Sequence, residues 1–377
     1  MSNAKKADPY RRLLRVMIIL LVLFVLVLTG YLLLDSYQKG QHTDQQRKVV
    51  EANNKMVEEY NRKVLEREAS LEPDIAPAWP EPKATGLDIL SLRGFAVKGA
   101  DSITVTRAEA LMGGLMVVNR WHELPADFVI AEAQLGSIMD GTDRRVPTEA
   151  RVLSLFPNAV TALDQMVQAA DEEGHKFFLV RDAFRSMQTQ TEKWNAEIAR
   201  FTARLSGDAL TEEARKTVSY PGTSDYQAGL SVNMDAYSAT DPVLNSTAFQ
   251  DTAQAKWLNE NCWKYGFVFR FPIMGYPSAD TVDKSYKTGI NIKLDTYRYV
   301  GVPHALVMHE MGMCLEEYIE YLIENQHVAV YEDGIIKYEI FRAEAGTADT
   351  QVAVPAGGAV YSVSSDNMGG IICAISY

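Results

Sequence analysis

A run of apolar, uncharged residues at positions 16–34 constrains this chain more than any other feature of its sequence. As a helix with a rise of about 1.5 Å per residue, the run nearly spans a bilayer hydrocarbon core of roughly 30 Å. Five Lys and Arg residues precede the run, and Asp35 follows it. By the positive-inside rule, this charge distribution predicts a cytoplasmic tail of residues 1–15 and an extracytoplasmic location for the rest of the chain.

A cleaved signal peptide is the alternative interpretation of the same segment. Its apolar core would be about 7–15 residues long and would lead into a small-residue cleavage site. The run at 16–34 is longer, and no A-x-A site follows Leu34. We therefore predict a single-pass protein of the cell membrane, anchored by one transmembrane helix.

The segment that follows the apolar run, residues 35–72, is rich in charged side chains. Val50, Val57 and Val64 recur at intervals of seven, which predicts a helical stalk and allows a dimer through a short coiled coil. A lone solvated helix is the alternative. Residues 73–84 contain four prolines and predict a stiff linker that ends where a globular domain begins.

The overall composition excludes some classes of partner. The net charge is −12, and a nucleic-acid partner would require a basic face. The three cysteines form no CxxC pair and no metal-ligand spacing, and an odd number implies no disulfide framework.

Residues 85–326 read as one domain in which strands and helices alternate. Strands are predicted at 176–180, 229–234, 267–271 and 296–300 from short apolar or β-branched runs. Helices are predicted at 159–170, 251–265 and 303–322 from apolar residues that recur on one face.

The last segment, residues 327–377, contains only predicted strands. Two runs flank Asp333-Gly334, which is a strong hairpin signal, and a second pair flanks residues 366–369. We predict a small C-terminal β-hairpin module.

Several separate blocks of the chain carry a resemblance to one family. They are residues 113–125 (GGLMVVNRWHELP), 181–186 (RDAFRS), 221–233 (PGTSDYQAGLSVN), 297–301 (YRYVG) and 314–318 (CLEEY). In this order and spacing they resemble VanY-type D-alanyl-D-alanine carboxypeptidases, of the lysostaphin, D-Ala-D-Ala peptidase and hedgehog fold group. The resemblance covers roughly residues 106–322. It implies an α+β fold with a small antiparallel sheet flanked by helices, and a peptidoglycan stem peptide as the substrate class.

The resemblance also implies a catalytic zinc ion. In the family, the motif S-x-H-x-x-G-x-A-x-D and a later E-x-x-H supply two His and one Asp as zinc ligands, with the Glu as general base for a zinc-bound water. In this chain Ser224 and Gly229 match the motif, but the first His position holds Tyr226 and the Asp position holds Asn233. The second His position holds Thr296, and the Glu position holds Lys293.

These replacements are chemically unfavourable to zinc. Zinc sites use imidazole, thiolate or carboxylate ligands, whereas a phenol with a pKa near 10 is mostly protonated at neutral pH. Lys293 would add a positive charge and cannot accept a proton while it is charged. We therefore predict no zinc, no other cofactor and no catalytic residue, and interpret the domain as a pseudoenzyme. The ligand pocket that the resemblance implies would consist of Arg185, which would hold a substrate carboxylate, with Gln190, Ser224, Tyr226, Asn233 and Thr296.

Three functions follow from these observations. The first is an inactive protein that binds peptidoglycan peptides or scaffolds cell-wall proteins. The second is an active D,D-carboxypeptidase with an atypical site. The third is a module that regulates a partner protein and needs no pocket. Asp225, Asp235 and Asp295 lie near the replaced positions and suggest at best a weak cation site, with turn and edge carboxylates as the favoured interpretation.

Overall fold

A computed structural model describes residues 21, 23, 28, 29, 51, 55, 58, 59, 61–63, 79–139, 146–150 and 152–377. The chain divides into two units, Met1–Pro77 and Ala78–Tyr377. In the first unit the described positions are helical and exposed, and Lys63 lies 3.7 Å from Glu59 one turn away. Most of the predicted membrane span and stalk lies outside the described residues. Within the described part, no helix is long and apolar enough to cross a bilayer.

The second unit contains a four-stranded antiparallel sheet with the order β5-β6-β8-β7. Its strands are β5 (Phe178–Asp182), β6 (Ser231–Ala236), β7 (Phe267–Phe269) and β8 (Thr296–Tyr299). All four predicted strands are therefore present, with ends that differ by a few residues. The α+β class expected from the resemblance is confirmed.

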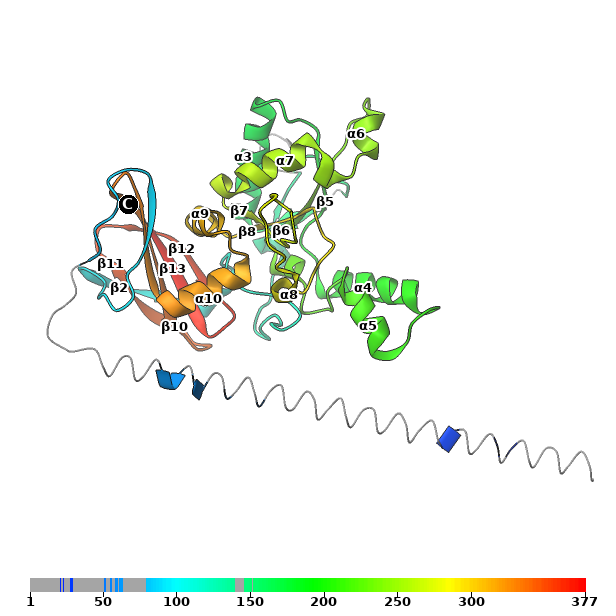
Figure 1. Ribbon diagram of the computed structural model, residues 1–377, viewed down its shortest axis with the longest axis horizontal. Coiled ribbons are helices and arrows are strands. Elements are labelled where there is room, and N and C mark those ends of the chain that lie inside the picture. Colours follow the sequence, from blue (N-terminus) through cyan, green and yellow to red (C-terminus); the bar gives the residue numbers. More distant parts are fainter. Residues whose placement is uncertain are drawn as a thin grey trace, which may run out of the picture. The chain divides into compact units, whose positions relative to one another are not determined.

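Two helices pack their apolar sides against this sheet, α3 (Pro157–Glu172) and α7 (Ala253–Asn261), and a 3₁₀ turn, η4 (Cys262–Tyr265), extends α7. Pro157 begins α3 at a position where its missing N–H costs no hydrogen bond. Leu163, Met166 and other residues on one face of α3 are buried in the core with side chains of β5 and β6. Gly174, with φ of 92°, follows the helix end, where a left-handed conformation favours glycine. Figure 1 shows α3 and α7 together beside the sheet.

Smaller elements surround this core. A helical pair, α4 (Met187–Phe201) and α5 (Gly207–Arg215), follows β5. The short helices and turns are α2 (Arg107–Leu111), η1 (Glu132–Gln134), η2 (Asp225–Ala228), α6 (Pro242–Ser246), η3 (Phe249–Asp251) and α8 (Ser285–Thr288). Two very short strands, β3 (Gly136–Ser137) and β4 (Ser154–Leu155), pair with each other.

The predicted helix 303–322 is wrong as a single element. The structure contains two helices, α9 (Val302–Met311) and α10 (Leu315–Asn325). Gly312 takes a left-handed conformation with φ of 61° and ends α9. Glu317 accepts a hydrogen bond from the Cys314 backbone N–H and caps the start of α10. Apolar periodicity continued across this break, which is why the sequence suggested one helix.

A five-stranded antiparallel sheet forms at the C-terminal end, with the order β1-β9-β10-β13-β12. Its strands are β1 (Leu87–Ser91), β9 (His327–Glu332), β10 (Ile335–Glu344), β12 (Ala359–Ser365) and β13 (Gly370–Ser376). Both predicted hairpins are present, β9–β10 across Asp333-Gly334 and β12–β13.

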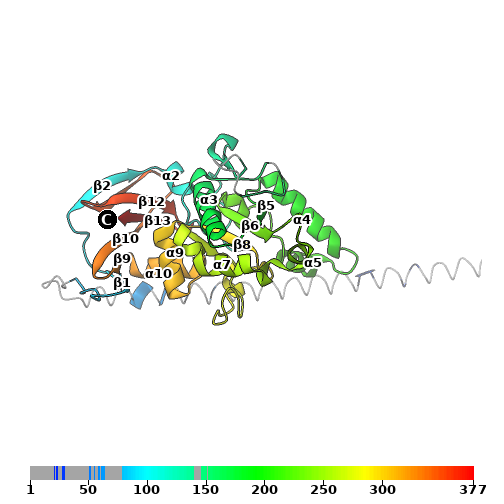
Figure 2. The same cartoon turned by 90° about the horizontal axis from the view of Figure 1, so that it is seen from above.

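Strands from before position 327 join this C-terminal part. β1 pairs with β9, and β2 (Ala100–Val105) pairs with β11 (Thr350–Pro355). Side chains of α10 are buried against one set of sheet residues, and those of β2 and β11 against another. Figure 2 shows β2 and α10 on either side of the sheet strands. Residues 87–105 thus tie the C-terminal sheet to the start of the unit.

Candidate functional site

The structure brings together the three positions at which the resemblance would place zinc ligands. Thr296 on β8 is the register partner of Asn233 on β6, and Asn233 is the partner of Asp182 on β5. Tyr226 lies on η2, and its hydroxyl is 2.8 Å from Thr296 Oγ1. Tyr226 and Thr296 are buried, and Asn233 is half-buried. The two hydroxyls satisfy each other in the interior, as buried polar groups must.

Two cationic side chains lie against the Tyr226 ring. The Arg185 guanidinium is 4.0 Å from the ring centroid, and Lys293 Nζ is 4.8 Å from it. Both distances are within the range of cation–π attraction. Burial, assisted by the positive charge of Arg185, lowers the pKa of Lys293 to about 8. Burial also raises the pKa of Tyr226 well above its ordinary value, so its hydroxyl is neutral.

Arg185 is already paired within the protein. Its Nε and one terminal nitrogen donate to Asp182 Oδ2 at 3.1 and 2.8 Å, and the other donates to Gln190 Oε1 at 3.0 Å. Lys193 also contacts Asp182, at 2.9 Å. Burial alone would raise the pKa of Asp182, but the charge and hydrogen bonds of Arg185 outweigh it and lower the pKa. Arg185, which was predicted to bind a substrate carboxylate, therefore binds the carboxylate of Asp182 in its own chain.

Gln190 and Ser224, the other predicted pocket residues, are buried. The Gln190 amide nitrogen donates to the Ser219 carbonyl at 2.7 Å, so this side chain is fully occupied between Arg185 and the backbone. Ser224 lies directly before η2 and lines a cavity of ≈ 10 Å³. The cavity is lined by Arg185, Ser219, Ser224, Asp225, Tyr226, Phe271, Ile290 and Lys293. That volume is about the room of one water molecule.

The nearby carboxylates are engaged elsewhere. Asp235 pairs with Arg181, and Asp295 accepts a hydrogen bond from Thr296 Oγ1 at 3.2 Å. Asp225 accepts hydrogen bonds from two arginines, described below. In the part of the chain that the structure describes, no three His, Cys, Asp or Glu side chains are placed to hold a metal ion.

A buried charge network connects the blocks of resemblance, and sequence reasoning missed it. Asp225 Oδ1 accepts from Arg270 Nε at 3.0 Å and from Arg298 at 2.8 Å. Arg270 also donates two hydrogen bonds to Glu316, at 3.0 and 2.8 Å, and Glu316 accepts from Asn119 at 3.0 Å. Burial alone would raise the pKa of Asp225, but the two arginines lower it.

This network gives several of those blocks a structural role. Arg298 donates to the carbonyls of Gly114 and Met116, at 3.0 and 3.3 Å, and so links the block at 113–125 to the block at 297–301. Four of the five blocks contribute a member, and Arg270 completes the set. These four blocks therefore contribute a buried network of ion pairs and hydrogen bonds to the fold.

Comparison with known proteins agrees with the resemblance. Residues 153–301 match the VanY family, D-alanyl-D-alanine carboxypeptidase. A D-alanyl-D-alanine carboxypeptidase of Enterococcus faecium is 26% identical over 273 residues, which are 72% of this chain and 78% of that protein. A Bacillus subtilis protein named "Putative carboxypeptidase YodJ" is 29% identical over 55% of this chain and 67% of its own length.

One solved structure supports the fold. The vancomycin-resistance D,D-dipeptidase VanXYg, in complex with a D-Ala-D-Ala phosphinate analogue, matches with a TM-score of 0.57 and 20% identity, over 74% of this chain and 99% of its own. A VanY D,D-pentapeptidase in complex with Zn(II) is 26% identical over 55% of this chain and 98% of its own, with a TM-score of 0.43. In this chain Tyr226, Asn233 and Thr296, at the positions where the resemblance implies zinc ligands, do not fit zinc, because two hydroxyls bond to each other, the third group is an amide, and two cations lie beside the Tyr226 ring.

Proposed function

Because the chain carries a domain of the VanY D-alanyl-D-alanine carboxypeptidase family, we propose that it is a cell-wall protein of this family that binds without hydrolysing. The observation that carries the proposal is the hydrogen bond between Tyr226 and Thr296, beneath Arg185 and Lys293. It replaces a site for a cation with a neutral, hydrogen-bonded pair that is flanked by positive charge. A divalent ion at this position would meet the positive charges of Arg185 and Lys293 and would find no anionic ligand among Tyr226, Asn233 and Thr296.

The loss of a general base supports the same conclusion. Lys293 stands where the family motif has Glu, and Arg185 lies close enough to favour its neutral form. With a pKa of about 8, Lys293 is still mostly protonated at neutral pH and holds no free pair for a water proton. The cavity of ≈ 10 Å³ beside Tyr226 and Lys293 has room for about one water molecule and is too small for an amide substrate.

The N-terminal sequence supports membrane attachment. We propose that residues 16–34 anchor the chain, that the N-terminus is cytoplasmic, and that the VanY-like domain faces the cell wall. The stalk at 35–72 would hold the domain away from the bilayer, with a coiled-coil dimer as one arrangement.

The ligand is a peptidoglycan stem peptide or a cell-wall protein. We call the pocket of Arg185, Gln190, Ser224, Tyr226, Asn233 and Thr296 the old pocket. Before Arg185 could bind a peptide carboxylate there, it would have to leave Asp182 and Gln190, which favours a protein partner bound to the outer surface. Lys193, with 43% of its side chain exposed, is the cation of this cluster that a carboxylate could reach without such a rearrangement.

The experiment uses a pentapeptide that ends in D-Ala-D-Ala. We expect no release of D-alanine, by coupled assay, from the purified chain with or without added zinc. Titration calorimetry with the same peptide then separates the two ligand classes. If the peptide binds with measurable heat and the Lys193→Ala variant binds it more weakly, a stem-peptide ligand is supported. If no heat of binding is observed, a protein partner is the remaining ligand class. Release of D-alanine by the chain, but not by a Tyr226→Ala variant, contradicts the proposal.

A further inference from the structure

Two adjoining cavities lie along α7, and they make up one groove. The first, of ≈ 540 Å³, lies between α7 and the segment 276–279. The second, of ≈ 340 Å³, continues along η4 towards α9. Asn259, Pro277 and Ser278 line both. None of the residues assigned above to the old pocket lines either cavity.

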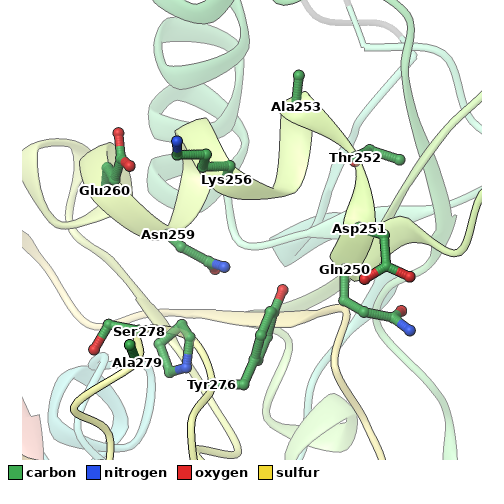
Figure 3. Close-up of a pocket in the computed structure, with 11 residues that line it drawn as sticks. Gln250, Asp251, Thr252, Ala253, Lys256, Asn259, Glu260, Tyr276, Ser278 and Ala279 are labelled. Atoms are coloured by element: carbon green, nitrogen blue, oxygen red, sulfur yellow. The ribbon is translucent and has the colours of Figure 1, made fainter.

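The two halves of the groove differ in chemistry. Figure 3 shows the first half, where Asn259 and Tyr276 reach towards each other across the space below α7, with Gln250 and Asp251 at one end. The second half is mainly apolar. Its lining includes Trp263, Phe269, Val282, Met308 and Met313, and His309 stacks on Trp263 with ring centroids 4.6 Å apart. A pocket of this size, apolar with a few polar groups, is typical of a binding site.

The charges of the groove favour a cationic group. Asp251, Glu260 and Asp280 are exposed, and none of them forms an ion pair with any residue that the structure describes. Lys256 is likewise exposed and without an ion pair within that part of the chain. Lys284, in the apolar half, is neutralised by Glu317 at 2.8 Å. Asp251, Glu260 and Lys256 line the first half of the groove and Asp280 lines the second, so the unpaired side chains along the groove carry a net negative charge.

The length of the groove favours an extended peptide. The wall runs from Thr252 to Trp263, which at about 1.5 Å per helical residue is roughly 16 Å. An extended chain advances about 3.3 Å per residue, so roughly five residues would lie along it. Carboxylates lie in both halves of the groove, and the apolar side chains lie mainly in the second.

From these observations we propose that the groove along α7 is a peptide-binding site. Its occupant is an extended segment of a partner protein that places an aromatic or aliphatic side chain beside Trp263 and a Lys or Arg side chain near one of the groove carboxylates, Asp251, Glu260 or Asp280. The site is separate from the old pocket, so the inference holds whether or not the chain hydrolyses peptides.

The test uses fluorescein-labelled octapeptides in a Gly/Ser background. Two carry one Phe and one Lys, in opposite orders, and a third and fourth carry Glu in place of Lys. We expect fluorescence anisotropy with the full chain to show saturable binding of at least one Lys peptide and at least tenfold weaker binding of its Glu counterpart. If none of the four binds below 1 mM, or if both charge types bind equally, the proposal is overturned.

Variants of exposed groove residues locate the binding. Val282 is 59% exposed, and Val282→Glu puts a charge in the apolar half; Val243, 72% exposed on α6, gives the matched control Val243→Glu. We expect at least a tenfold loss with the first variant and less than a twofold change with the second. The double variant Glu260→Lys, Asp280→Lys should reverse the preference for Lys over Glu peptides, whereas Glu123→Lys, outside the groove, should not. Unchanged binding in both groove variants, with unchanged circular dichroism, contradicts the site.

Discussion

The hydroxyl oxygen of Tyr226 lies 2.8 Å from Thr296 Oγ1, and the two side chains are 3% and 0% exposed. Thr296 Oγ1 has a further partner in Asp295, at 3.2 Å, whereas Thr296 is the one hydrogen-bond partner of the Tyr226 hydroxyl among the described residues. The pair is therefore asymmetric, and removal of the two hydroxyls should have different costs.

Tyr226→Phe should destabilise the domain by about 1 kcal/mol, because Thr296 keeps Asp295 as a partner. Thr296→Val should cost more, about 1–3 kcal/mol, because it leaves a buried phenol without a partner. Urea unfolding followed by tryptophan fluorescence gives both values. Equal costs, or a larger cost for Tyr226→Phe, would show that the hydrogen bond is not formed as described.

Restoration of the family's ligands should restore metal binding. Asn233 and Thr296 are register partners and Tyr226 contacts Thr296, so Tyr226→His, Asn233→Asp and Thr296→His place three zinc ligands together. With Lys293→Glu added, we expect about one zinc per chain after dialysis. The control carries Lys293→Glu alone and should bind none. A folded fourfold variant without zinc would mean that these residues do not correspond to the family's ligands.

The buried network should be far more sensitive than a surface ion pair. Arg270→Met leaves the Asp225 and Glu316 carboxylates without their shared partner, and loss of one member of a buried pair costs roughly 3–5 kcal/mol. Arg181, 42% exposed and paired with Asp235 and Glu149, gives the control Arg181→Met, with an expected cost of about 0–1 kcal/mol. Thermal unfolding monitored by circular dichroism compares them, and similar losses would refute a structural role for the network.

The lowered pKa of Lys293 predicts a pH dependence of stability. The pKa is about 8 in the folded protein and 10.5 in its ordinary state. Below pH 8 both folded and unfolded chains hold the proton, so the full cost of burying the charge is present. Between pH 8 and 10.5 the folded chain releases the proton first, and the cost declines as pH rises.

The measurement compares the wild-type chain with Lys293→Met, in which this titration is absent. The free energy of unfolding of the wild-type chain, relative to that of the variant, should be constant from pH 6 to 7 and increase from pH 8 to 10. A decrease over that range would mean that Lys293 is stabilised in its charged form.

Much of the fold could be predicted because its elements carry local signals. Apolar periodicity identified α3 and α7, and Asp333-Gly334 identified the hairpin of β9 and β10. β1 and β2 lack such signals. Their residues are partly exposed and gain their partners, β9 and β11, only from segments more than 200 residues away.

The position of the candidate site could be predicted from the sequence, but the pairing of its side chains could not. The resemblance placed Tyr226, Asn233 and Thr296 together, and the structure does so. The resemblance could not reveal that Asp182 already forms an ion pair with Arg185. The two residues are three apart in sequence, and whether their side chains meet depends on the path of the backbone between β5 and α4. The role of Arg270 was missed for a similar reason, because its partners lie more than 40 residues away in sequence.

The most direct test of the central claim is the zinc content of the purified chain, determined by mass spectrometry after equilibration with excess zinc and dialysis. We expect far less than one zinc per chain, since the positions where the resemblance implies zinc ligands hold a phenol, an amide and a hydroxyl. Retention of about one zinc per chain, lost in Tyr226→Phe or Thr296→Val, would contradict it.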